Sequence, residues 1–149
     1  MQRIAGSIRE RGVFVDTSAF LALIASNDSR HLQDTQVLDR LQRNQHYLYT
    51  IKYVIYESHA GILSDVGVDE ARAFLRGMAR TAARIERVSG TDEDQSRQLV
   101  YHHTDKEYSL CDATSFVVMK RLGLALAFSL DEHFTQAGFS PPLDYEEWP

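Results

Sequence analysis

The sequence is poor in cysteine and has no long apolar run. Cys111 is the only cysteine among the 149 residues, so no disulfide can form within the chain. A single free thiol suits a reducing cytoplasm. No stretch approaches the roughly 18 apolar residues that span a membrane, and residues 1–12 lack the apolar segment of a signal peptide. The sequence therefore predicts a cytoplasmic protein that does not associate with membranes.

Positive charge is also scarce. Lysine and arginine number 16 against 21 acidic residues, which gives a net charge of −5 and a pI of about 5.6. Proteins that bind phosphates usually carry a basic footprint, so this balance counts against a nucleic acid as partner. The objection weakens if several acids gather at a cation site and if the arginines are segregated from them. The positions of both along the chain therefore matter.

Short apolar segments alternate with amphipathic ones along a length that fits one domain, residues 1–149, with an irregular tail at 140–149. We expect strands at 13–15, 46–50, 84–88 and 124–130, and helices at 19–25, 29–44, 52–65, 69–81, 92–103 and 109–122. Gly123 should end the last helix. The tail, which begins near Pro141, can add an edge strand. Alternation of this kind predicts an α/β fold whose parallel sheet is covered on both faces.

Two acidic residues come directly after predicted buried strands. Asp16 follows the first strand, and Asp131 follows the fourth. In open parallel sheets, ligands bind beyond the carboxyl ends of the strands, at the point where the strand order switches. If these two strands are neighbours, both carboxylates lie at one crevice. Their spacing along the chain leaves that adjacency open.

Two further acids lie in predicted helices. Asp112 is in the first turn of the helix at 109–122, and Glu57 lies within the helix at 52–65 among apolar neighbours. Crowded carboxylates repel one another and take up protons unless a cation compensates their charge. Hard divalent ions meet that need, and Mg²⁺ is typically held by one or two carboxylates, water and substrate phosphate.

Each acid also has a purely structural alternative. Asp16 can cap the helix that follows it, and Asp112 matches a capping box with Ser109. Glu57 can be a solvated helix residue, and Asp131 can belong to a turn after a strand. None of the four is specific alone, and their joint placement at strand ends and helix starts is the suggestive feature.

Four segments, in this order, resemble successive motifs of PIN-domain ribonucleases, in particular the VapC toxins of toxin–antitoxin pairs. They are VFVDTSAFLALI, YVIYES, SLCDATSFVVMKRLG and LAFSLDEHFTQAGF, which lie between residues 13 and 139. The segment around Glu57 is the least specific of them. Residues 1–12 extend beyond the usual start of the family, and we assign them no role.

The resemblance implies a three-layer α/β/α sandwich around a mostly parallel sheet of about five strands. It implies that Asp16, Glu57, Asp112 and Asp131 form a catalytic site for Mg²⁺ or Mn²⁺. Hydroxyl groups of Thr17 or Ser18 and of Ser129 would orient the carboxylates. The activity implied is hydrolysis of RNA, often tRNA or rRNA, by metal-activated water. The implied partners are a second copy of the chain, as a homodimer, and a VapB-like antitoxin.

A basic stripe is a further candidate site. Arg72, Arg76 and Arg80 recur every four residues on one predicted helix. Such a stripe can contact RNA phosphates or an acidic antitoxin segment through bidentate hydrogen bonds. The simpler interpretation is a solvated helix face, since exposed arginines often contribute nothing measurable.

Three other functions are alternatives to an RNA-cleaving enzyme. The main alternative is a non-catalytic PIN-like module that binds RNA or protein, although such a module has no need to keep crowded carboxylates. A haloacid-dehalogenase-like phosphatase would need an aspartate two residues after Asp16, where this chain has Ser18. A receiver domain would need a phospho-accepting aspartate after a middle strand and a lysine near the last one, and neither is evident.

Overall fold

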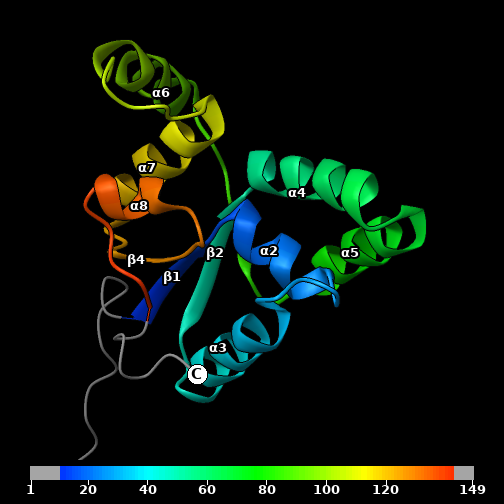
Figure 1. The fold of residues 1–149 in the computed structure, drawn as a ribbon. Coiled ribbons are helices and arrows are strands. Elements are labelled where there is room, and N and C mark those ends of the chain that lie inside the picture. Colours follow the sequence, from blue (N-terminus) through cyan, green and yellow to red (C-terminus); the bar gives the residue numbers. More distant parts are fainter. Residues whose placement is uncertain (1–10, 143–149) are drawn as a thin grey trace, which may run out of the picture.

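The computed structural model describes residues 11–142, so the predicted extension, except for its last two residues, and most of the tail lie outside the described residues. Within this range the chain forms four strands and seven helices (Figure 1). In order they are β1 (Gly12–Val15), α2 (Thr17–Ile24), α3 (His31–Arg43), β2 (Tyr47–Ile51), α4 (Lys52–Asp65), α5 (Val68–Arg80), β3 (Arg84–Glu86), α6 (Gly90–His102), α7 (Leu110–Leu122), β4 (Leu126–Phe128) and α8 (Glu132–Gln136).

The four strands form one parallel sheet in the order β3-β2-β1-β4. Phe14 of β1 is in register with Tyr49 on one side and with Ala127 of β4 on the other. The chain builds β2 and β3 on one side of β1 and then crosses to place β4 on the other side. The strand order therefore switches beside β1, and β1 and β4 are neighbours, as the acidic pattern required.

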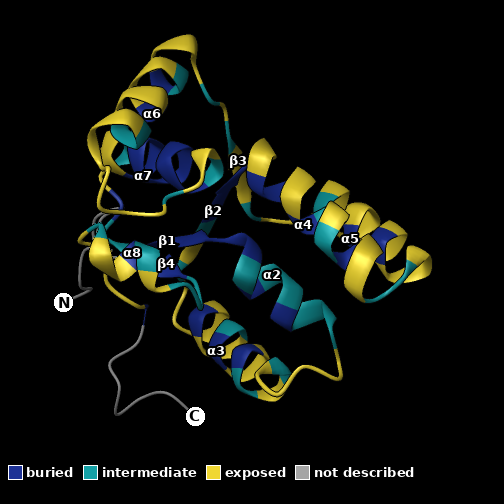
Figure 2. Ribbon diagram, turned by 45° about the horizontal axis from the view of Figure 1, so that its top comes forward, coloured by how far each residue is buried: buried dark blue, intermediate teal, exposed yellow. Residues whose placement is uncertain are grey.

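Helices cover both faces of this sheet. Side chains alternate along β1, so Val13 and Val15 pack with α2 and α3 while Phe14 packs with α7 and α8. Figure 2 shows β1 and most of α7 buried, with exposed residues on the outer faces of the helices. The predicted three-layer α/β/α arrangement is confirmed, and four strands come close to the five expected.

The helix pair α4–α5 extends away from the sandwich (Figure 1). It is attached to α2 by a small apolar cluster that includes Ile55, Ile62 and Phe74. The ring of Phe20 from α2 meets Phe74 edge-on, with centroids 5.5 Å apart. Because α4 begins directly after β2, its first turns lie at the carboxyl edge of the sheet.

The predicted strand at 124–130 is wrong at both ends, since β4 spans only Leu126–Phe128. Gly123 ends α7 in the left-handed conformation, with φ 73°, as predicted, and the N–H of Leu124 closes the helix on the carbonyl of Met119. Beyond β4 the chain turns into α8, which was not predicted. In place of a fifth strand, Ser140 forms a single parallel bridge with Leu126.

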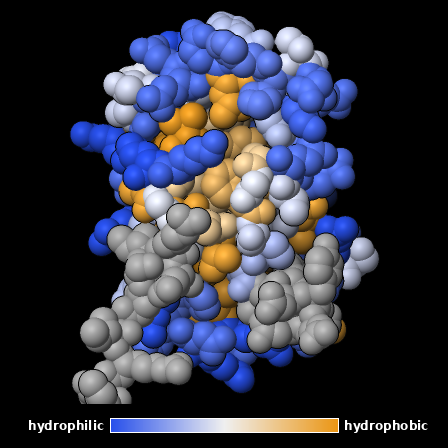
Figure 3. All heavy atoms as spheres, turned by 90° about the vertical axis from the view of Figure 1, so that its left-hand side faces the viewer, coloured by the Kyte–Doolittle hydropathy of each residue, from blue (hydrophilic) through white to orange (hydrophobic). Residues whose placement is uncertain are grey.

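Figure 3 views the molecule from the side of α6, α7 and β4. Apolar side chains reach the surface there in a band that lies below a hydrophilic upper region. Among the described residues, no helix is long and apolar enough to cross a membrane.

Candidate active site

Asp16 lies at the switch point, directly after β1, and only 4% of its surface is exposed. Its Oδ2 accepts hydrogen bonds from the hydroxyls of Ser18, at 3.1 Å, and Ser129, at 3.0 Å. Burial raises the pKa of Asp16 to about 6, and the charge of Asp112 raises it further against the opposing hydrogen bonds from Thr17 N–H, Ser129 and Ser18. Although Asp16 occupies the N-cap position of α2, its side chain makes no capping hydrogen bond.

Two serine hydroxyls tie the end of β4 to the start of α2. Ser18 Oγ lies 3.2 Å from Ser129 Oγ and accepts a hydrogen bond from the N–H of Leu130. Ser129 Oγ accepts one from the N–H of Asp131. These contacts fix the carboxylate of Asp16 relative to the loop that carries Asp131. The hydroxyl of Thr17, in contrast, is buried without a hydrogen-bond partner among the described residues.

Asp112 and Asp131 meet at His133. The Nδ1 atom of His133 lies 3.1 Å from Oδ2 of Asp112 and 3.3 Å from Oδ1 of Asp131. The ligand atoms of these three side chains lie within 4.8 Å of one another. Both aspartates also hold helix ends: Asp112 forms a capping box with Ser109 at α7, and Asp131 accepts the N–H of His133 at α8.

His133 was not among the site residues predicted from the sequence. It is half-buried, and the ring of Tyr108 packs edge-on against it with centroids 5.4 Å apart. The available signal was its position two residues after Asp131, within the turn that Asp131 caps. Its approach to Asp112 depends on how α7 and α8 pack, and no local pattern reports that.

Glu57 reaches the same region from α4. Its side chain is exposed and acts on the thiol of Cys111 on α7. Burial is the largest cause of a raised pKa for Cys111, followed by the nearby carboxylate of Glu57 and then by the charges of Asp16 and Asp112. The charges of three predicted acids therefore act on one thiol, and the fourth acid, Asp131, is linked to Asp112 through His133.

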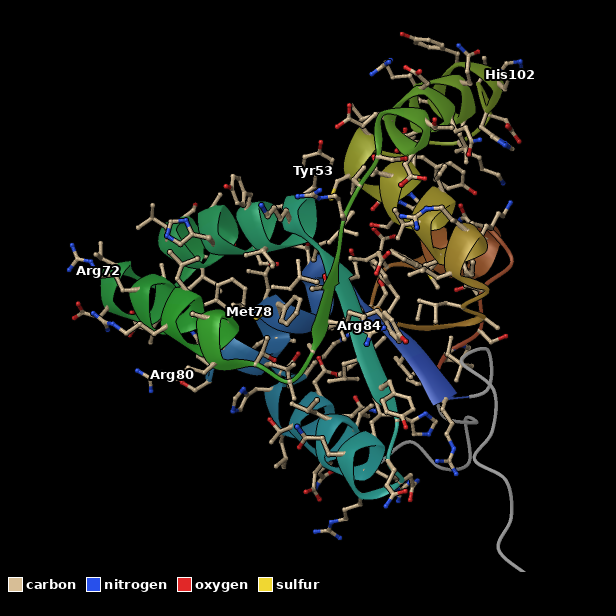
Figure 4. All side chains as sticks on the ribbon, turned by 180° about the vertical axis from the view of Figure 1, so that it is seen from behind. Tyr53, Arg72, Met78, Arg80, Arg84 and His102 are labelled. Atoms are coloured by element: carbon tan, nitrogen blue, oxygen red, sulfur yellow. The ribbon has the colours of Figure 1, made fainter. Side chains whose placement is uncertain are left out.

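The arginine stripe lies elsewhere. Arg72, Arg76 and Arg80 are all exposed on α5. Figure 4 shows Arg72 and Arg80 on the outer helix pair, pointing away from the sheet. Arg72 has a carboxylate neighbour, Asp69, at 4.0 Å. These three arginines are thus separated from the acidic site. Such a separation is one of the two conditions under which the negative net charge is compatible with binding of a nucleic acid.

The donor set fits a hard divalent cation. Its groups are carboxylate oxygens with one imidazole nitrogen, a set that suits Mg²⁺ or Mn²⁺ better than softer metals. Asp16 is a buried carboxylate with a raised pKa, and among the described residues no cationic side chain lowers that pKa. A cation bound between Asp16 and Asp112 would offset both the lost hydration and the mutual repulsion.

Comparison with known proteins gives consistent results. The family model for the PIN domain matches residues 13–140. The 23S rRNA-specific endonuclease VapC20 of Mycobacterium tuberculosis is 33% identical over 128 residues, which cover 85% of this chain and 95% of that protein. Ribonuclease VapC26 of the same species is 26% identical over 124 residues, 83% of this chain and 90% of that protein.

Solved structures agree with these matches. The crystal structure of VapC20 from M. tuberculosis, described as a toxin that cleaves the sarcin-ricin loop, has a TM-score of 0.78 and 32% identity. The match covers 86% of this chain and 96% of that one. FitAcB from Neisseria gonorrhoeae, at 14% identity, has a TM-score of 0.59 over 87% of this chain and 97% of that one, and it supports the fold alone.

Proposed function

The chain belongs to the PIN-domain family, and on that premise we propose that it is a metal-dependent endoribonuclease that hydrolyses RNA phosphodiester bonds as the toxin of a toxin–antitoxin pair. The observation that carries the proposal is the convergence of Asp16, Asp112 and Asp131 at the switch point of the sheet, beside Glu57. These residues are separate in sequence, and their like charges come together at a cost that a cation would offset.

Each residue has a role that its contacts support. Asp16 and Asp112 would be the central ligands of Mg²⁺ or Mn²⁺, and Asp131 and Glu57 would complete the site directly or through water. Ser18 and Ser129 hold one oxygen of Asp16 in place and so orient the carboxylate. Thr17 stays a weaker candidate for this role, because its hydroxyl makes no such bond in the described chain.

The bound cation would activate the attacking water and neutralise charge that develops on the phosphate. One of the four carboxylates would accept the proton of that water. His133 holds Asp112 and Asp131 through its Nδ1 and adds a third side chain to their arrangement. The burial of Asp16 keeps bulk water away from the inner side of the site.

The relatives narrow the substrate class. VapC20 acts on 23S rRNA, and we infer that ribosomal RNA is the first substrate to test here, with tRNA as the second. A VapB-like antitoxin and a second copy of the chain are the proposed partners. The exposed arginines of α5 (Arg72, Arg76 and Arg80) offer a separate surface for RNA phosphates or for an acidic antitoxin segment.

The direct test is cleavage of bacterial ribosomes and of deproteinised 23S rRNA, with the new 5′ ends mapped by sequencing. We expect cutting with Mg²⁺ or Mn²⁺, none in EDTA, and none from Asp112→Asn in either metal. Asp69→Asn is the matched control, because Asp69 is almost fully exposed on α5, and it should cut like the wild type. Full activity of Asp112→Asn would remove Asp112 from the mechanism.

The same assay separates the nuclease from a non-catalytic PIN-like module. A module that only binds would retain RNA in a filter or mobility-shift assay and produce no new 5′ ends in either metal. That result, obtained with folded protein on both ribosomal RNA and tRNA, would refute the catalytic proposal.

A further inference from the structure

A hollow opens beside the acidic site, between the start of α4, the first turns of α6 and the start of α7. Its volume is about 400 Å³, and it is lined by Tyr53, Glu93, Arg97, Leu110, Cys111 and Thr114. That size is within the roughly 300–1,000 Å³ range of sites for small ligands. Figure 4 shows Tyr53 at the end of α4 that faces α6 and α7. None of these residues except Cys111 takes part in the contacts of the acidic site.

Cys111 lies between the hollow and the acidic side chains. It lines the hollow, and the carboxylates of Glu57, Asp16 and Asp112 all raise the pKa of its thiol, so these acids lie close to it. A phosphate of RNA held at the acidic site therefore places an adjoining nucleotide next to the hollow. Single-stranded RNA is commonly recognised in this way, by a splayed base that stacks on an aromatic ring and hydrogen-bonds through its edge.

The lining offers the groups that such a base needs. Tyr53 is 42% exposed and Leu110 is 54% exposed, so an aromatic ring and an apolar side chain border the opening. The hydroxyl of Tyr53 donates to Oε1 of Glu93 at 2.5 Å and thereby holds that carboxylate at the hollow. Arg97, whose guanidinium pairs with Asp94, supplies hydrogen-bond donors from the same helix face.

This combination discriminates among bases. A carboxylate only accepts, so it favours a base edge with adjacent N–H donors, and guanine alone presents N1–H beside an N2 amino group. Its O6 and N7 accept from arginine. Adenine and cytosine place a ring-nitrogen acceptor beside their amino group, and uracil flanks its one N–H with carbonyls, so each would face Glu93 with an acceptor.

Building on the proposed nuclease function, we propose that this hollow binds a guanine base adjacent to the scissile phosphate and sets the cut-site preference of the enzyme. Tyr53 stacks on the base and orients Glu93. Glu93 accepts from N1–H and the N2 amino group, and Arg97 donates to O6.

The first experiment measures binding without cleavage. The full chain is titrated in EDTA with each of the four nucleoside 5′-monophosphates and followed by NMR of the backbone amides. GMP should bind about tenfold more tightly than AMP, CMP or UMP and should shift the amides of residues 110–114. Glu93→Gln should abolish this preference, because an amide presents a donor to one of the guanine donors, whereas Glu107→Gln, an exposed matched control outside the hollow, should keep it.

Tyr53→Phe provides a second variant that preserves the ring. It should retain stacking and reduce the GMP preference several-fold, because Glu93 loses the hydroxyl that orients it. Equal binding of the four nucleotides by folded wild-type protein would overturn the inference. So would GMP-induced shifts confined to α5, which would report phosphate contacts with the arginines.

The second experiment measures cleavage of an RNA library with a randomised central segment. Guanine should be enriched at one position flanking the cut, and Glu93→Gln should lose that enrichment. Guanine-selective binding without cleavage in either metal would refute the proposed nuclease function but would still support the hollow as a guanine-binding site. Cleavage by Glu93→Gln with the same base preference as the wild type would refute the guanine site. The same conclusion would hold if this variant weakened only the binding of an antitoxin peptide.

Discussion

Replacing Asp16 by asparagine should stabilise the metal-free protein while removing its response to metal. In the folded chain the pKa of Asp16 is about 6, above the ordinary 3.8, with burial as the main cause and the charge of Asp112 as a further one. The folded state therefore binds a proton at this carboxyl more tightly than the unfolded state. For this group, stability is greatest below about pH 4 and falls as the pH rises toward 6 and above.

The size of the effect follows from the two pKa values. A difference of about two pH units corresponds to about 3 kcal/mol at neutral pH. Asparagine removes the charge but keeps an oxygen that can accept from Ser18 and Ser129. Because these bonds are weaker to an amide than to a carboxylate, we expect Asp16→Asn to gain about 1–3 kcal/mol at pH 7.5.

The assay is urea unfolding in EDTA at pH 4 and pH 7.5, followed by thermal melts with Mg²⁺ or Mn²⁺. The gain should vanish at pH 4, where the wild-type carboxyl is protonated. Metal should raise the melting temperature of the wild type and leave that of Asp16→Asn nearly unchanged. The exposed control Asp69→Asn should change stability by less than about 0.5 kcal/mol. If Asp16→Asn is no more stable than the wild type at pH 7.5 in EDTA, the charge argument for this site is wrong.

Two further predictions concern carboxylates outside the site. Asp34 is fully buried on α3, its oxygens have no hydrogen-bond partner among the described residues, and burial raises its pKa to about 6. Asp34→Asn should therefore raise the unfolding free energy by about 1–3 kcal/mol at pH 7.5 and by almost nothing at pH 4. Urea titrations at the two pH values would measure this difference. Arg121 donates to both oxygens of Asp92 at 2.9 and 3.0 Å. Arg121→Ala should cost about 2 kcal/mol in the same assay, less than a fully buried pair because Arg121 is 40% exposed, and Arg121→Lys should recover part of it.

Except for α8, the order of strands and helices followed from local patterns, whereas the exact ends of some elements did not. The run at 13–15 is apolar and ends at Asp16, and the run at 46–50 is rich in residues that favour strands, so both strands lie near where they were expected. The run LALAFSL is apolar apart from Ser129 and gives no clear signal for the ends of the strand. Its paired length is set from outside, by the left-handed Gly123 on one side and by the turn into α8 on the other.

For the site, too, the features that depend on local sequence could be predicted, and those that depend on long-range packing could not. Asp16 and Asp131 were recognisable because each follows an apolar strand, and Asp112 because it opens a helix. That β1 and β4 are neighbours depends on pairing between distant residues, shown by the hydrogen bond from Ser129 to Asp16, 113 positions apart. The same holds for His133, whose contact with Asp112 depends on how α8 packs on α7.

The structural and the functional interpretations of the acids, which the sequence presented as alternatives, are compatible in this fold. The capping contact of Asp112 engages Oδ2, and that of Asp131 engages Oδ1, so a second oxygen of each carboxylate is a separate ligand atom. Capping anchors each side chain to a helix N-terminus, where the peptide dipoles favour negative charge and lower the cost of crowding. Asp16, which makes no capping bond, is held by Ser18 and Ser129 instead. A metal would therefore meet carboxylates that are already oriented, which reduces the ordering that binding must impose.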